Sequence, residues 1–205
     1  MKNYYNIMKR ISHITPKSVL EIGSRDGHDA NKLSTLFNIE PSSVHVIEPH
    51  PASYKYILET YPHFNLYNIA ISDVTCRHPF IALKEDVGVS SLRERNDNFY
   101  NIKKKDEIYV DCYRGRDFLN KYNLNELQFD ICKIDVEGLT YEVLDGFGSS
   151  LKNIKSMHIE CEYKEIWKNQ KTRNEVFDFL DKAGYYKVYE KNMHNVQSDS
   201  IWILK

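Results

Sequence analysis

The sequence lacks the features that mark membrane, secreted and zinc-knuckle proteins. Its apolar runs are far shorter than the roughly 20 residues of a membrane helix, so we expect no membrane insertion. The N-terminus has no apolar core of the kind found in a secretory signal. The four cysteines are scattered and form no C-x-x-C pair, which argues against a zinc site or a disulfide framework. We therefore expect reduced thiols and a cytoplasmic protein.

The chain also has almost no net charge. Lys and Arg number 28 against 29 Asp and Glu, which gives a formal net charge of -1. Nucleic-acid-binding proteins carry clustered positive charge, so no nucleic-acid partner is expected. Hydrophobic residues make up 41% of the 205 positions, enough for a packed core, and the length fits a single domain over residues 1–205.

Short apolar runs alternate with helical patterns along the chain. Residues 18–22, 44–47 and 64–71 are predicted strands, and the two stretches between the first three strands have helical spacing. Further strands are predicted at 78–83, 108–112, 129–134 and 156–161, and an antiparallel pair at 185–189 and 200–204. Helices are predicted at 116–122, at 139–144 with Gly146 closing the helix, and from a capping box of Thr172 and Glu175 onward. A polar loop is predicted at 93–106. This order predicts an α/β fold with parallel strands joined by crossover helices.

The first loop is the most informative segment. Residues 19–29 run from a strand through a loop with two glycines into a helix. In an open parallel sheet, ligands bind at the carboxyl ends of the strands. Gly23 permits a sharp turn and lets a ligand approach the backbone. Glu48 ends the second strand, where a carboxylate can accept hydrogen bonds from both hydroxyls of a ribose.

Several nucleotide classes compete for this loop. The phosphate-loop pattern G-K-[ST] is absent, and the dinucleotide fingerprint requires glycine where this chain has Arg25. Asp26 and Asp29 would repel a pyrophosphate. S-adenosylmethionine carries a sulfonium and an ammonium and no phosphate, so it suits an acidic loop. The alternative without a ligand is an ordinary strand-to-helix turn with a capping aspartate.

Five motifs follow one another along the chain. They are E-I-G-x-x-x-G at 21–27, I-E-P-H-P at 47–51, N-I-A-I-S-D at 68–73, G-V-S-S-L at 88–92, and K-I-D-V-E-G at 133–138 with E-V-L-D-G at 142–146. The first resembles motif I of Rossmann-like S-adenosylmethionine-dependent methyltransferases, and the other four resemble motifs of the FkbM family of these enzymes. Each motif alone is unspecific, but five in order are specific. The resemblance implies a Rossmann-like class I methyltransferase fold, with a mostly parallel seven-stranded sheet and helices on both faces. The chain departs from the family at Arg114 and Arg116, which hint at an anionic acceptor group or are plain surface charge.

The resemblance also implies how S-adenosylmethionine would be held. Gly23, Ser24, Arg25 and Gly27 would line its methionine part, Glu21 would lie near its amino end, Glu48 would hold the ribose, Pro49 and His50 would flank the adenosine, and Ala70, Ile71 and Ser72 would lie beside the adenine. Arg25 and His50 could equally be ordinary polar loop residues.

Candidate catalytic residues follow the later strands. Methyl transfer to a hydroxyl requires a positioned acceptor and removal of its proton. Asp135 ends a predicted central strand, and Glu137 lies on the same side if that strand continues. The alternative for Glu137 is a helix N-terminal charge. Lys133 has the parity of Asp135 and could pair with it.

A second polar set alternates along one predicted strand. His158, Glu160 and Glu162 share a face by this alternation, so they are candidates for a base or for metal ligands. Asp135, Glu160 and His158 would suit Mg²⁺ or Mn²⁺ better than zinc, and the resemblance permits a metal without requiring one. The alternative is a polar face in water. His194 and Asp199 are expected in the last turn, and Trp167 in packing or stacked on a sugar.

These patterns predict a methyltransferase that acts on a hydroxyl of a sugar, a glycan precursor or a related small polar acceptor. The acceptor follows from the resemblance, since FkbM-like enzymes often act on oxygen in glycans. A nitrogen or phosphate-derived acceptor stays open, and so does a non-catalytic methyltransferase-like binding module. An NAD-dependent or nucleotide-sugar enzyme is disfavoured by the absent fingerprint, and a nucleic-acid methyltransferase by the absent N-P-P-[YF]. The sequence predicts no oligomeric state.

Overall fold

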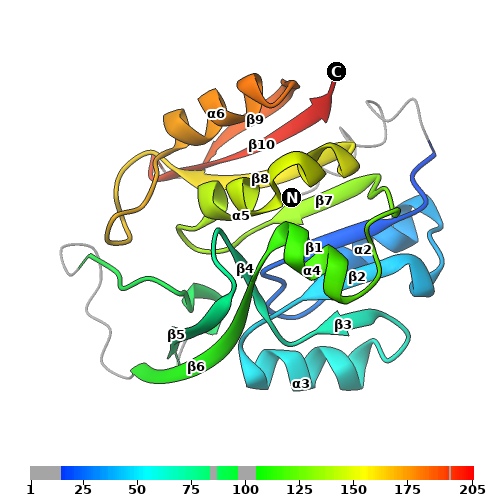
Figure 1. Ribbon diagram of the computed structural model, residues 1–205, viewed down its shortest axis with the longest axis horizontal. Helices are drawn as coiled ribbons and strands as arrows, with labels where there is room; N and C mark the ends of the chain where they lie inside the picture. The colour runs from blue at the N-terminus through cyan, green and yellow to red at the C-terminus, as the bar shows by residue number, and fades with distance from the viewer. Residues whose placement is uncertain (1–14, 84–86, 97–104, 194) are drawn as a thin grey trace.

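A seven-stranded sheet forms the centre of the molecule (Figure 1). The computed structural model describes residues 15–83, 87–96, 105–193 and 195–205. The sheet order is β3-β2-β1-β7-β8-β10-β9. The strands are β1 (Val19–Ile22), β2 (Val44–Ile47), β3 (Asn65–Tyr67), β7 (Ile131–Ile134), β8 (Ser156–Glu162), β9 (Tyr185–Met193) and β10 (Gln197–Leu204). β10 is antiparallel to both of its neighbours and the remaining pairs are parallel, which confirms the predicted mostly parallel sheet.

Helices cover both faces of this sheet. One face packs against α2 (His28–Phe37) and α3 (Pro51–Thr60), and the other against α4 (Gly115–Lys121), α5 (Thr140–Phe147) and α6 (Arg173–Lys182). Short 3₁₀ turns lie at η1 (Pro41–Ser43), η2 (Val87–Val89) and η3 (Gly148–Asn153). Because both faces are covered, the short central strands β1, β2 and β7 are buried at every residue.

Local sequence accounts for where several helices begin and end. Pro51 opens α3, where its missing amide hydrogen costs nothing, and the ring of His50 caps the same turn. Thr172 and Glu175 form the predicted capping box of α6. Gly146 was predicted to end α5, but it lies inside that helix. A Cβ at Gly146 would lie 2.0 Å from the carbonyl oxygen of Ser72, so glycine is needed there for close packing.

A second, three-stranded sheet was not predicted. Its order is β4-β6-β5, with β4 (Ala70–Ser72), β5 (Cys76–Leu83) and β6 (Lys105–Arg114). The single strand predicted at 64–71 is therefore wrong, because this segment divides into β3 and β4 in different sheets. The Asn68 side chain donates to the carbonyls of Glu48 and Pro49 at 2.8 and 3.1 Å, which redirects the chain between them. The predicted loop at 93–106 gives way to β6 at Lys105, and residues 97–104 lie outside the described part of the chain.

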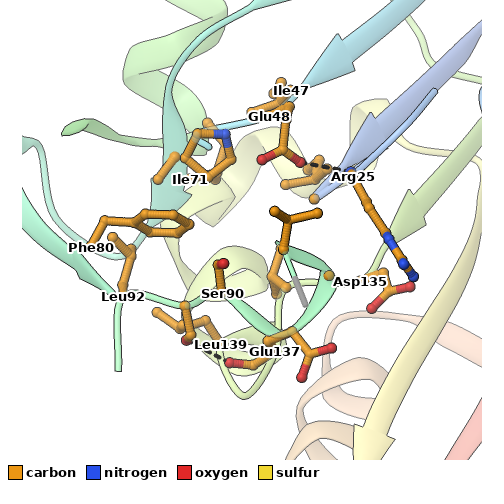
Figure 2. A pocket seen from close by; sticks show the side chains of 18 residues that line it. Arg25, Ile47, Glu48, Ile71, Phe80, Ser90, Leu92, Asp135, Glu137 and Leu139 are labelled. Atoms are coloured by element: carbon orange, nitrogen blue, oxygen red, sulfur yellow. Dashed lines mark hydrogen bonds between the residues drawn. The ribbon is translucent and has the colours of Figure 1, made fainter. Parts of the chain in front are cut away.

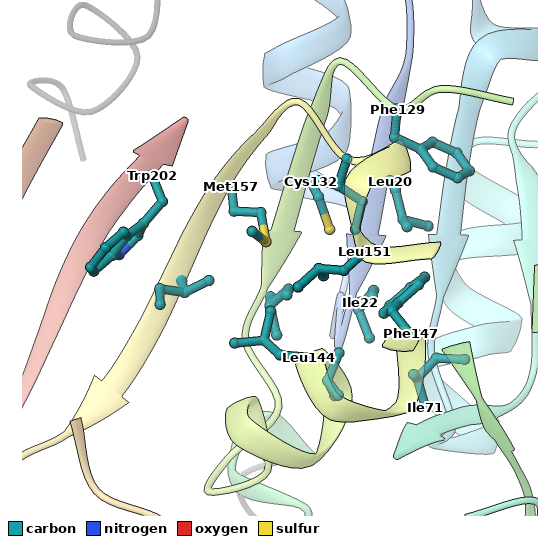
Figure 3. Packing of buried hydrophobic residues seen from close by; sticks show 14 of the residues in the cluster. Leu20, Ile22, Ile71, Phe129, Cys132, Leu144, Phe147, Leu151, Met157 and Trp202 are labelled. Carbon is teal, nitrogen blue, oxygen red and sulfur yellow. The ribbon is translucent and has the colours of Figure 1, made fainter. Parts of the chain in front are cut away.

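The carboxyl ends of β1, β2 and β7 meet at one edge of the main sheet, beside the three-stranded sheet. Figure 2 shows the pocket that opens there. One core cluster lies on the face covered by α2 and α3, and another lies behind this edge, on the face covered by α4, α5 and α6. Leu20 and Ile22 of β1 pack there with Cys132 and with Leu144 and Phe147 of α5 (Figure 3). The pocket therefore rests on rigid strand ends backed by tightly packed side chains.

The cysteines fit the expected role as free thiols. Cys112, Cys132 and Cys161 are buried, Cys76 is exposed, and all four are free. In the described part of the chain, every helix is too short or too polar to cross a bilayer.

Candidate active site

The turn after β1 brings three strand ends into contact. Gly23 has a φ of 78°, and its amide donates to the carbonyl of Ile47 at 3.0 Å. A Cβ at Gly23 would lie 1.9 Å from the carbonyl oxygen of Asp135. Any larger residue would therefore separate β1 from β7. Gly27 has a φ of 74° and meets the ring of Tyr61 instead, where a Cβ would lie at 2.8 Å. Gly27 thus serves helix packing and lines neither of the pockets described below.

A pocket of about 540 Å³ lies at these strand ends (Figure 2). Its walls come from the main sheet, from the three-stranded sheet and from the segment 87–92 that crosses above them. The lining residues are Ile22, Gly23, Arg25, Ile47, Glu48, Pro49, Ala70, Ile71, Phe80, Val87, Gly88, Ser90, Ser91, Leu92, Asp135, Val136, Glu137 and Leu139. One end of the pocket is apolar, and the other end carries carboxylates.

Glu48 points into the middle of the pocket. Its carboxylate accepts the backbone amides of Arg25 and His50, both at 2.7 Å, and the side chain is 5% exposed. Burial raises the pKa of Glu48 to about 7, although the amides favour the ionised form. A carboxylate has about four lone-pair sites, so Glu48 keeps capacity to accept a hydrogen bond from a ligand beside its bonds to the backbone.

Several of the residues that the resemblance places near the adenosine line the apolar end of the pocket. Ala70 and Ile71 come from β4 and Phe80 comes from β5. Pro49 also lines the pocket. His50 does not, because its Nδ1 accepts the Ala52 amide at 3.2 Å and its ring packs edge-on against Phe80.

Ser72 lies behind the apolar end. Its hydroxyl donates to Asp73 at 3.0 Å, and its carbonyl faces Gly146 of α5. The residue is buried against the helix and lines neither pocket.

A second pocket of about 770 Å³ continues from the acidic end. Gly23, Arg25, Gly88, Asp135 and Glu137 line both pockets. The second pocket is completed by Ser24, Asp26, His28, Asp29, Lys133, Glu160 and Gln197. The two pockets therefore adjoin along these shared residues and together form one site, which contains both the apolar end and the carboxylates.

Three carboxylates converge where the pockets join. Ligand atoms of Asp135, Glu137 and Glu160 all lie within 4.8 Å of one another. β7 ends at Ile134, so the assumed continuation of the strand is wrong. Glu137 reaches this group because its backbone adopts a left-handed conformation with a φ of 48°. Burial, together with Asp135 and Glu137, holds the pKa of Glu160 well above its usual range.

Lys133 is paired, as one reading of the sequence predicted. Its Nζ lies 2.7 Å from Asp29, 3.1 Å from Asp135 and 3.8 Å from Glu21. Burial disfavours the charged lysine, but the three carboxylates raise its pKa well above the usual range. Lys133 thereby sets the position of the Asp135 side chain at the wall of the second pocket.

Glu21 supports the first loop from below. It is completely buried and lines neither pocket. Its carboxylate accepts the hydroxyl of Ser24 at 2.7 Å and the amide of Ala30 at 3.2 Å, while the Ser24 hydroxyl accepts the amide of Gly27. Burial raises the pKa of Glu21 to about 7. Glu21 is therefore placed to shape the loop from behind the residues that line the pockets.

The polar residues of β8 share a face but separate into different environments. Glu160 joins the carboxylate group, whereas Nε2 of His158 lies 3.3 Å from Oδ1 of Asp199. Glu162 is buried and accepts the side-chain amide of Gln170. The carboxylate group thus contains Glu137 in place of His158 in the predicted metal set. Asp199 belongs to β10 and not to a turn, and His194 lies outside the described residues.

The segment 87–92 forms one wall of the site, a role that the sequence did not predict. Its signal was the G-V-S-S-L motif, yet neither spacing nor polarity indicated what it would touch. Arg114 donates to the carbonyl of Asp73 at 2.7 Å, Arg116 lies near Asp117, and neither arginine lines the two pockets. They give no support to an anionic acceptor group.

Trp167 has a packing role, one of the two expected for it. It is 2% exposed, and its ring lies against Gly138. It is therefore buried in the packing behind the site, where no sugar ring could stack on it.

Comparison with known families decides the classification. Residues 21–186 match the model of the methyltransferase FkbM domain. The chain belongs to the FkbM methyltransferase family. The resemblance drawn from the five motifs is thereby confirmed. A comparison with curated proteins found no match.

Solved structures confirm the fold of S-adenosylmethionine-dependent methyltransferases. Aeropyrum pernix fibrillarin with natively bound S-adenosyl-L-methionine gives a TM-score of 0.53 at 11% identity, covering 98% of this chain and 74% of that chain. A ribosomal protein L11 methylase from Lactobacillus delbrueckii subsp. bulgaricus gives 0.51 at 10% identity, covering 100% and 79%. The N-terminal domain of EvdMO1, solved in the presence of SAH and D-fucose, gives 0.50 at 11% identity, covering 100% and 81%. At such identities the likeness is one of fold.

Proposed function

We propose that this FkbM methyltransferase transfers a methyl group from S-adenosylmethionine to a hydroxyl of a sugar, a glycan precursor or a related small polar acceptor. The observation that carries the proposal is the site formed by the two adjoining pockets, in which a buried carboxylate separates an apolar end from three converging carboxylates. A nucleoside fits the first part, and a polar acceptor fits the second.

The residues present fit the cofactor. Glu48 retains acceptor capacity toward the pocket and would hold the ribose hydroxyls. Ala70, Ile71 and Phe80 would contact the adenine through apolar surface. Asp26 and Asp29 lie at the other end, where the sulfonium and ammonium charges would be favoured.

Glu160 is the proposed base. Bound S-adenosylmethionine supplies an electrophilic methyl group with a good leaving group, so the protein must place the acceptor and remove its proton. Glu160 lines the second pocket, and its raised pKa makes its carboxylate a stronger proton acceptor than an ordinary glutamate. Asp135 and Glu137 would orient the acceptor through hydrogen bonds to its hydroxyl groups.

The proposal also includes a divalent cation bound at the three carboxylates. The oxygen atoms of Asp135, Glu137 and Glu160 suit Mg²⁺ or Mn²⁺, which prefer carboxylate ligands. With the ion bound, these three residues would be its ligands, and the ion would supply a Lewis acid for the acceptor hydroxyl in place of proton removal by Glu160. His158 is not part of this set because it is paired with Asp199.

The acceptor class is supported by two considerations. The carboxylates at the junction of the pockets are hydrogen-bond acceptors that suit the hydroxyl groups of a sugar. The N-terminal domain of EvdMO1, which shares the fold, was solved in the presence of D-fucose.

We also propose a cytoplasmic location for the FkbM methyltransferase described here. The four cysteines of this chain are scattered and free, which fits a protein of a reducing compartment.

Calorimetry of cofactor binding tests the proposal directly. S-adenosylhomocysteine is titrated into metal-stripped protein and again with Mg²⁺ or Mn²⁺. We expect micromolar binding that Glu48→Ala abolishes and that the exposed control Glu40→Ala leaves unchanged. A screen with labelled S-adenosylmethionine against sugars, nucleotide sugars and small amines then identifies the acceptor. Absence of binding by folded protein would favour a non-catalytic module, and labelling of amines alone would overturn O-methylation.

A further inference from the structure

The segment 87–96, called the strap below, crosses from the three-stranded sheet to the loop that follows β8. Its first half lines the cofactor pocket through Gly88, Ser90, Ser91 and Leu92. Its second half is fastened to the loop at 166–169, since the amide of Asn96 donates to the carbonyl of Ile166 at 2.7 Å. Figure 2 shows Ser90 and Leu92 along the rim of the pocket opposite Glu48, with Glu137 on the same rim.

Ser91 connects the strap to the turn at Glu137 and Gly138, which carries the Glu137 carboxylate. Its hydroxyl donates to the carbonyl of Glu137 at 2.8 Å and accepts the amide of Arg93 at 3.1 Å. The residue is 2% exposed, so this bond is shielded from competing water. Ser91 is also held from behind by backbone hydrogen bonds to Ile81 of β5 in both directions.

Arg93 fastens the same turn at the next residue. Its guanidinium donates to the carbonyl of Gly138 at 3.3 Å and to the carbonyl of Asn169 at 2.7 Å. It also forms an ion pair of 2.6 Å with Glu142 in the first turn of α5. The fork-shaped donor set of arginine allows one side chain to hold three segments at once. A lysine could not reproduce this arrangement.

The turn held in this way has an unfavourable backbone conformation. Glu137 and Gly138 have φ values of 48° and 85°, and left-handed conformations are disfavoured for residues with a side chain. The ring of Trp167 also packs against Gly138, where a Cβ would lie 2.3 Å from the ring. Such a conformation persists only where its neighbours determine it.

We propose that the strap is a positioning device, in which Ser91 and Arg93 hold the Glu137–Gly138 turn so that the Glu137 carboxylate joins Asp135 and Glu160. The consequence for methyl transfer rests on the proposed function, whereas the effect on the turn does not. Because the strap also lines the cofactor pocket, an occupied pocket and an ordered turn stabilise one another.

Amide hydrogen exchange of the ligand-free protein tests the inference. Ser91→Ala removes the bond to Glu137, so we expect about tenfold faster exchange of the amides at 136–142, with the amides of β1 and β2 unchanged. Ser91→Thr keeps the hydroxyl and should restore much of the protection. Arg93→Lys should act as Ser91→Ala does. Ser149→Ala, on the exposed surface of η3, is the matched control and should change nothing.

The outcomes test the role of the strap independently of the proposed function. Unchanged exchange at 136–142 in both Ser91→Ala and Arg93→Lys overturns the strap, whatever the protein binds. Faster exchange throughout the protein also overturns it, because that result reports general destabilisation. S-adenosylhomocysteine affinity is then measured on the same variants, and a loss of fivefold or more is expected. If the wild-type protein does not bind this ligand, the proposed function fails while the exchange data still decide the strap.

Discussion

Glu21 and Lys133 are direct partners across the parallel β1–β7 pair, and their charged groups lie 3.8 Å apart in the interior. Lys133 also contacts Asp29 and Asp135, so one ammonium serves three carboxylates. The glycine loop rests on Glu21 through Ser24 and Ala30. This buried ion network therefore links the floor of the first loop to the wall of the acidic pocket.

Lys133→Met should destabilise the protein strongly, because it leaves a buried carboxylate without its cation. The expected loss is about 3–5 kcal/mol in the free energy of unfolding at pH 8, measured by urea denaturation. Lys155→Met provides a matched control. The Lys155 side chain is 37% exposed and pairs with a single carboxylate among the described residues, that of Asp130, so its loss should cost about 1 kcal/mol or less.

The cost of Lys133→Met should also depend on pH. The folded-state pKa of Glu21 is about 7, above its ordinary value of 4.5. The folded protein therefore binds the extra proton between these values, and the contribution of Glu21 to stability falls as pH rises through this window. Without Lys133 the pKa rises further, so the variant should lose less stability at pH 5.5 than at pH 8. Equal losses at both pH values would contradict the assignment to Glu21.

Gly23→Ala should disrupt the site more than a left-handed glycine elsewhere. A Cβ at Gly23 would overlap the carbonyl of Asp135, while Gly148, with a φ of 53°, has open space around its Cβ position. Gly148→Ala should therefore cost about 1–2 kcal/mol from backbone strain alone. Gly23→Ala should cost more and should abolish S-adenosylhomocysteine binding, as measured by thermal unfolding and calorimetry. Similar results for both variants would contradict the close approach of β1 and β7.

Sequence patterns were sufficient for features that depend on neighbouring residues. The strands and helices through α3, the capping box of α6 and the pairing of Lys133 with Asp135 follow from periodicity, caps and parity. The break between β3 and β4 did not, because residues 64–71 form one continuous β-rich run. The break depends on Asn68 reaching the carbonyls of Glu48 and Pro49, which is a tertiary contact.

The site shows the same division between local and tertiary determinants. Alternation correctly placed His158, Glu160 and Glu162 on one face of β8, but it could not show which neighbour each would meet. His158 pairs with Asp199, which lies on β10, a strand that comes much later in the chain. Glu137 enters the carboxylate group through a left-handed turn, and this turn is held by Ser91 and Arg93. Such contacts between distant segments leave no periodic signal.

Cofactor affinity should depend on pH through Glu48. Its carboxylate must be ionised to accept both ribose hydroxyls, and its pKa is about 7. The ionised fraction falls about tenfold between pH 8 and pH 6, so S-adenosylhomocysteine should bind about tenfold more weakly at pH 6. Glu48→Gln should bind weakly at both pH values and lose this dependence in calorimetric titrations. An unchanged pH dependence in Glu48→Gln would assign the titration to another group.

Glu160→Gln should separate chemistry from cofactor binding. Glu160 does not line the pocket with the apolar end, which would hold the nucleoside, so S-adenosylhomocysteine affinity should fall far less than kcat does. Removal of a general base typically lowers kcat by about 10²–10⁴-fold, and we expect a loss in that range with the acceptor found by the labelling screen.

The pH profile of this variant distinguishes a base from a binding residue. Wild-type kcat should increase with pH as Glu160 loses its proton. Because the pKa of Glu160 is raised, this rising limb should extend to pH values above the ordinary pKa range of a glutamate before kcat becomes constant. Glu160→Gln should lack this limb, whereas the exposed control Glu40→Gln should keep both the limb and the wild-type kcat. A variant that retains the limb but has a higher KM for the acceptor would make Glu160 a binding residue and move the proton acceptor to Asp135 or Glu137.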